Sequence, residues 1–118
     1  MKIYRNTLVL DPAKGGNGIM VIQQDRGARH MPRDNFIHDN DIVMAGGTGA
    51  VTGWFADYKW KRFPDANNRW DRNHYHLGTL AEGQDVFAPN KWVGFEQWRA
   101  TGQDAHSTVD GDVAERVR

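Results

Sequence analysis

The chain has 118 residues, enough for one domain, and its 15 basic and 15 acidic side chains give a formal net charge of zero. This balance argues against the basic footprint of a duplex-binding protein, and the absence of cysteine excludes a disulfide scaffold, a thiolate zinc site and a thiol nucleophile. No apolar run approaches the roughly 18 residues of a membrane span, and the run at residues 8–10 is too short for the core of a signal peptide. We therefore expect neither a nucleic-acid partner nor a membrane partner, and the sequence assigns no localisation.

Composition favours strands and turns over helices. The chain has 13 glycines, five tryptophans and only four leucines, and its mean hydropathy is -0.73. Glycine and the abundant asparagine and aspartate suit turns, whereas aromatic side chains suit strands. These features predict an all-β fold.

The first feature in chain order is an internal repeat. Residues 3–10 match residues 37–44 at an offset of 34, and residues 35–44 match residues 68–77 at an offset of 33 without a gap. Apolar residues within these segments fall two apart, which is strand periodicity. The repeat makes three asparagines equivalent, and we expect their amides to stack as a hydrogen-bonded ladder at a turn: Asn6, Asn40 and Asn73.

A second block repeats after glycine-rich turns. Residues 19–25 match residues 51–57 at an offset of 32, and irregular loops follow at residues 26–33 and 58–66. On this alignment Trp54 matches Ile22, and in the first block Trp70 matches Ile3 and Ile37. Both tryptophans are therefore predicted to lie in the core.

Strands that repeat at a fixed period and stack on their equivalents make a β-solenoid. We predict one domain at residues 1–107, with coils at about 1–33, 34–66 and 67–90. Residues 91–107 should form a cap, a short amphipathic helix or turn ended by Gly102. Its Trp92, Phe95 and Trp98 are predicted to lie on the last coil, and residues 108–118 to form a polar, flexible tail.

Four segments carry a resemblance to a known family. They are Ile22-Gln23-Gln24-Asp25-Arg26, Asn35-Phe36-Ile37-His38-Asp39-Asn40, Arg72-Asn73-His74-Tyr75 and Phe95-Glu96-Gln97-Trp98-Arg99-Ala100-Thr101-Gly102-Gln103-Asp104-Ala105. Together they resemble the C-terminal part of bacterial right-handed parallel β-helix repeat proteins of the pectate-lyase-like superfamily. The resemblance implies a short right-handed parallel β-helix of about three coils with a C-terminal aromatic or helical cap. It also implies an association with extracellular polysaccharide, although members usually carry many more coils.

The two irregular loops hold the candidate catalytic residues. Asp25 and Asp57 occupy equivalent positions at strand ends, and Arg26 and Lys59 follow them closely. Lyases of the superfamily typically use a basic side chain to abstract a proton next to a uronate carboxyl, while carboxylates hold calcium. Two carboxylates one coil apart would also suit a retaining glycosidase. In the structural alternative, both aspartates cap strand ends and pair with Arg26, Lys59 or Arg72.

Carbohydrate could also bind without catalysis. Tyr58, Trp60 and His30 lie in the loops, where exposed rings can stack on sugars. Tyrosine and tryptophan are equally typical of subunit contacts.

Histidines raise the question of a metal site. His74 and His76 flank Tyr75 on one strand face, and Asp71 or His38 could supply a third ligand. A solvated strand face explains these histidines without a metal. We predict no metal and no cofactor, with calcium only in a lyase.

The sequence thus predicts a β-helix module associated with carbohydrate, acting as a non-catalytic binding or assembly unit. The alternative is a polysaccharide lyase or glycoside hydrolase acting on an acidic glycan. Strand edges near Ile3, Leu8 and Leu10 have no cap in the first coil, and open edges seek partners. We therefore expect a homodimer or a higher closed oligomer, joined through the first coil or the loop around Trp60.

Overall fold

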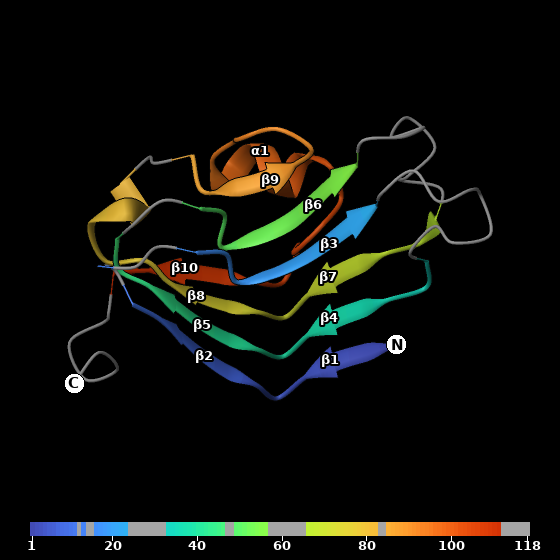
Figure 1. Ribbon diagram of the computed structural model, residues 1–118, viewed down its shortest axis with the longest axis horizontal. Coiled ribbons are helices and arrows are strands. Elements are labelled where there is room, and N and C mark those ends of the chain that lie inside the picture. Colours follow the sequence, from blue (N-terminus) through green and yellow to red (C-terminus); the bar gives the residue numbers. More distant parts are fainter. Residues whose placement is uncertain are drawn as a thin grey trace.

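The computed structural model describes residues 1–11, 13, 16–23, 33–46, 49–56, 66–82 and 85–111. In these residues, short strands form three parallel sheets, accompanied by one α-helix and one short 3-10 helix (Figure 1). The chain passes through the three sheets in the same order three times. The described chain is therefore mostly β with parallel pairing, and the coarse fold prediction is confirmed.

The first sheet contains three strands, β1 (Lys2–Tyr4), β4 (Phe36–His38) and β7 (Arg69–Asp71). The middle residues Ile3, Ile37 and Trp70 pair across it at offsets of 34 and 33. Ile37 and Trp70 are buried and Ile3 is half-buried. Trp70 is thus a core residue, as its position in the repeat predicted.

The second sheet contains four strands, β2 (Thr7–Leu10), β5 (Asp41–Met44), β8 (His74–His76) and β10 (Thr108–Asp110). Leu8, Ile42, Tyr75 and Val109 pair in that order and point into the core. Residues 108–110 were expected to belong to a flexible tail, but they form β10. They do so because Thr108 and Asp110 pair with β8 and extend its sheet by one strand.

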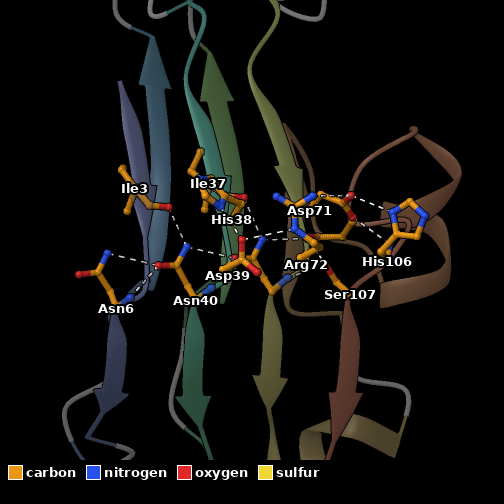
Figure 2. Close-up of polar contacts among 12 residues, drawn as sticks. Ile3, Asn6, Ile37, His38, Asp39, Asn40, Asp71, Arg72, His106 and Ser107 are labelled. Carbon is orange, nitrogen blue, oxygen red and sulfur yellow. Dashed lines mark hydrogen bonds and ion pairs between the residues drawn. The ribbon is translucent and has the colours of Figure 1, made fainter.

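A two-residue turn joins the first sheet to the second in every round. Its first residue is Arg5, Asp39 or Arg72, with φ of 56°, 54° and 54°. Its second residue is an asparagine, and the predicted ladder is confirmed (Figure 2). The sharp bend turns the main-chain N–H of each asparagine toward the next round. There the side-chain oxygen of the residue at the equivalent position accepts its hydrogen bond.

Each rung of this asparagine ladder is a paired contact. The main-chain N and the Nδ2 of Asn6 donate to Asn40 Oδ1 at 3.1 and 3.2 Å. Asn40 donates to Asn73 Oδ1 in the same way, at 3.1 Å for both atoms. Asn40 and Asn73 have no exposed surface. Because buried amides must be paired, the ladder fixes how the rounds stack.

The third sheet contains three strands, β3 (Ile19–Gln23), β6 (Thr52–Ala56) and β9 (Phe87–Pro89). Val21 pairs with Trp54, and Ile22 pairs with Phe55, so the offset is 33. The predicted offset of 32 is therefore wrong by one residue. The difference arises between Gly49 and the start of β6 at Thr52, where the chain has one residue more than the alignment allowed. Trp54 is buried as expected, but opposite Val21, whereas Ile22 is 54% exposed.

The C-terminal segment covers the last round. Helix α1 (Phe95–Ala100) packs on β9, Trp98 is fully buried, and Gly102 has a φ of 96°. Phe95 lies against Phe87, at 5.2 Å between ring centroids. Trp92 does not lie over the core as expected. It is 49% exposed beside Phe55, because Val93 and not Trp92 turns inward to bridge Phe87.

Asp104 ends the ladder beneath this cap. Its carboxylate is fully buried and accepts hydrogen bonds from four side chains, those of Asn73, Tyr75, Trp98 and Ser107. Burial first, and then the charge of Asp104, raise the pKa of the Tyr75 phenol well above its ordinary value. The phenol therefore stays protonated and donates to Asp104 Oδ2 at 2.6 Å.

Candidate functional site: the outer face of the first sheet

The candidate catalytic and sugar-stacking residues of the two loops lie outside the described residues. They are Asp25, Arg26, His30, Asp57, Tyr58, Lys59 and Trp60. The structure thus brings none of them into view, and the lyase or hydrolase alternative stays a prediction. It does describe β3 and β6, the parallel strands from which both loops depart.

In the described chain, a different surface carries several aromatic and charged side chains. Because side chains alternate along a strand, the inward positions of Ile3, Ile37 and Trp70 place their neighbours on the other side of the sheet. We call this surface the outer face; its residues are Lys2, Tyr4, Phe36, His38, Arg69 and Asp71.

The first row of the outer face places a ring between two cations. Lys2 pairs with Phe36, and Phe36 pairs with Arg69. The Arg69 guanidinium carbon lies 4.6 Å from the centre of the Phe36 ring, a cation–π distance. Within the described chain, neither Lys2 nor Arg69 has a carboxylate at ion-pair distance. Among the described residues, the row therefore carries two positive charges that form no ion pair.

The second row continues the aromatic surface. The rings of Tyr4 and His38 stack, with centroids 5.0 Å apart and planes 5° from parallel. His38 also lies 4.4 Å from Phe36, which joins the two rows. Tyr4 is 46% exposed. Three neighbouring rings thus form one platform that reaches solvent.

An ionic network borders the platform at the turn (Figure 2). His38 Nδ1 lies 2.6 Å from Asp39 Oδ2, and Arg72 Nε lies 3.3 Å from the same oxygen. The hydrogen bond from His38 and the contacts of Arg72 lower the pKa of Asp39, although its slight burial acts in the opposite direction. Asp39 therefore remains a carboxylate at neutral pH.

Asp71 closes the network on the C-terminal side. His106 binds it twice, through the main-chain N to Oδ1 and through Nδ1 to Oδ2, both at 2.8 Å. Partial burial raises the pKa of Asp71, but these hydrogen bonds outweigh that effect and hold the pKa below its ordinary value. The acidic groups at this border, Asp39 and Asp71, thus bind His38, Arg72 and His106. In the described chain, Lys2 and Arg69 form no ion pair with either of them.

The sequence offered little to reveal this face. Its outward residues share no repeated type: Tyr4 matches His38 and Asp71, and Lys2 matches Phe36 and Arg69. Only their places beside the repeated core positions could have grouped them. From the sequence, the only role predicted for His38 is that of a third metal ligand.

His74 and His76 of β8 were the candidate metal ligands, and their described contacts are structural. His76 is 5% exposed, with Nε2 2.9 Å from Asp41 and Nδ1 2.8 Å from Asp110. The expected solvated face is therefore wrong for His76, because β10 extends the sheet beside it. His74 remains exposed and contacts Thr108. In the described ranges, no group of three or more histidine and acidic side chains is placed to hold a metal ion.

Comparisons with family models, curated proteins and solved structures give no match. Among the described residues, no helix has the length and apolar character needed to span a membrane. What the protein does must therefore be argued from the outer face.

Proposed function

We propose that the chain is a short right-handed parallel β-helix of about three coils that acts as a binding module for an acidic glycan. Three parallel sheets visited in a constant order, at offsets of 33 and 34, support the solenoid. Crossover connections between parallel strands of one sheet are right-handed in nearly all proteins, which supports the hand. The binding role rests on the outer face.

One observation carries the proposal: the cation–ring–cation row of Lys2, Phe36 and Arg69. Equivalent positions on adjacent parallel strands lie about 4.8 Å apart, so the main-chain positions of Lys2 and Arg69 lie about 10 Å apart, with Phe36 between them. A uronate polymer carries carboxylates at intervals along a chain of apolar sugar faces. Its carboxylates would pair with Lys2 and Arg69 while a sugar packs against the exposed Tyr4 ring.

Titration with uronate oligosaccharides tests the proposal, with neutral oligosaccharides of equal length as the comparison. We expect the protein to bind the acidic series, with an affinity that falls as salt is raised. Arg69→Gln and Lys2→Gln should each weaken binding about tenfold, since each removes one charge-assisted contact. Tyr4→Ala should weaken it by removing part of the platform.

Lys91→Gln is the matched control, because Lys91 is an exposed cation on the connection between β9 and α1. It should bind as tightly as the unaltered protein. If the protein binds no acidic oligosaccharide, or if Lys91→Gln weakens binding as much as Arg69→Gln, the proposal is wrong.

A further inference from the structure

The two ends of the coil stack differ. β1, β2 and β3 are each one of the two edge strands of their sheet, and all three belong to the first round (Figure 1). At the opposite end, the main-chain N of Asp104 donates to Trp70 O beside β7, and Val93 bridges Phe87 of β9. In the described chain, the first round thus presents three open strand edges. At the opposite end the edges of β7 and β9 are covered, and β10 is the outer strand of the second sheet.

The open edge of β2 presents specific main-chain groups. The main-chain N of Asp41 donates to Asn6 O at 2.9 Å, so the main chain of Asn6 faces β5. Because this orientation alternates along a strand, the main chain of Leu8 also faces β5, and that of Thr7 and Val9 faces the open edge. Leu8 and Leu10 pack on the core but remain half-buried. The edge therefore offers hydrogen bonds beside incompletely covered leucines.

Opposite charges flank this strand. Arg5 precedes it and Asp11 follows it, and both are exposed. Asp11 Oδ1 accepts a hydrogen bond from Ala13 N, and Arg5 lies 5.7 Å from the Tyr4 ring. In the described ranges neither of them forms an ion pair. A two-fold antiparallel arrangement would bring each arginine to the aspartate of the other copy.

We propose that β2 is the contact surface of a two-fold homodimer, in which two β2 edges pair antiparallel about an axis at Leu8. Thr7 of each copy lies opposite Val9 of the other, so both residues with outward main-chain groups form hydrogen-bonded pairs. Leu8 meets its own counterpart on the core side, and Arg5 and Asp11, just beyond the two ends of β2, come near their oppositely charged counterparts in the other copy. Every residue keeps its side of the sheet in this register, which a shift by one residue would destroy. A two-fold contact of this kind is closed and adds no third copy.

Sedimentation equilibrium of the 118-residue protein and of charge variants tests the dimer, independently of glycan binding. We expect the unaltered protein to dimerise at micromolar concentration and to dissociate as salt is raised. Arg5→Asp and Asp11→Arg should each raise the dimer dissociation constant about tenfold or more, because each puts like charges opposite one another. The double variant should restore dimerisation, since the pairs are then reversed.

Lys91→Glu makes the same reversal of charge away from β2 and should leave the dissociation constant unchanged. Circular dichroism of each variant verifies that it is folded. A protein that stays monomeric at about 100 micromolar, forms larger assemblies, or fails to regain dimerisation in the double variant overturns the proposal.

Discussion

At the scale of single residues, the buried Asp104 carboxylate organises the C-terminal end. It has no exposed surface, and no basic side chain is among its described partners. Burying a charge is costly unless hydrogen bonds replace its water. Here donors from β8, α1 and the asparagine ladder converge on two oxygens. Asp104 therefore ties the helix, the ladder and the second sheet together.

Tyr75→Phe tests this role through pH. Because the pKa of Tyr75 is raised on folding, its contribution to stability is fully present below about pH 10 and is lost as pH rises above that value. Tyr75→Phe should lower the free energy of unfolding at pH 7 by about 1–3 kcal/mol, since Asp104 loses one donor. The alkaline loss should then be smaller than in the unaltered protein. Urea titrations from pH 7 to 11 measure both effects.

Tyr4→Phe is the control, because Tyr4 is 46% exposed and donates to no described group. It should retain the alkaline loss of the unaltered protein. An unchanged pH dependence in Tyr75→Phe would contradict the role given to the buried phenol.

At the scale of elements, close packing between β6 and β9 depends on one glycine. Gly53 has a φ of 139°, and a Cβ there would lie 2.1 Å from the carbonyl oxygen of Ala88. That oxygen belongs to the main chain of β9 and cannot rotate away. The third sheet therefore tolerates no side chain at this position.

Gly53→Ala should lower the free energy of unfolding by about 3 kcal/mol or more, because it adds a main-chain clash to an unfavourable φ. Gly16→Ala separates the two effects. Gly16 has a φ of 108°, but a Cβ on it would meet no described atom within 4 Å. Gly16→Ala should therefore lower the free energy of unfolding by only about 1–2 kcal/mol. Urea denaturation of the pair measures the difference, and equal losses would refute the clash.

The same elements explain how far sequence carried the prediction. Asn6, Asn40 and Asn73 recur without gaps and flank period-two apolar residues, so the first sheet, the first three strands of the second sheet and the ladder followed directly. The third sheet was misaligned by one residue because glycine-rich turns accept an extra residue without leaving a sequence mark. The outer face could not be predicted from the repeat. Strands that stack on one another need apolar residues at the inward positions, whereas the outward positions can hold residues of different types.

At the scale of the whole molecule, the rounds are joined mainly to their neighbours. The paired offsets of 33 and 34 mean that each strand contacts its equivalent in the next round. In such a stack, stability is a sum of rounds and of the interfaces between them. The last round gains the additional interface with α1 and Asp104, whereas the first round has one neighbour in the described chain. Self-association through β2 would supply the missing interface.

The indole rings of the last rounds give the protein an optical signature. Trp54 of β6, Trp70 of β7 and Trp98 of α1 have ring centroids 5.3 to 5.9 Å apart. Electronic transitions of rings held this close couple, so we expect intense near-ultraviolet circular dichroism bands. These bands should be lost when α1 detaches from β9. Trp98→Phe should abolish most of this signal, and Trp92→Phe, at an exposed ring outside the cluster, should preserve it. Stopped-flow dichroism could then time the closing of the stack during refolding without an attached dye.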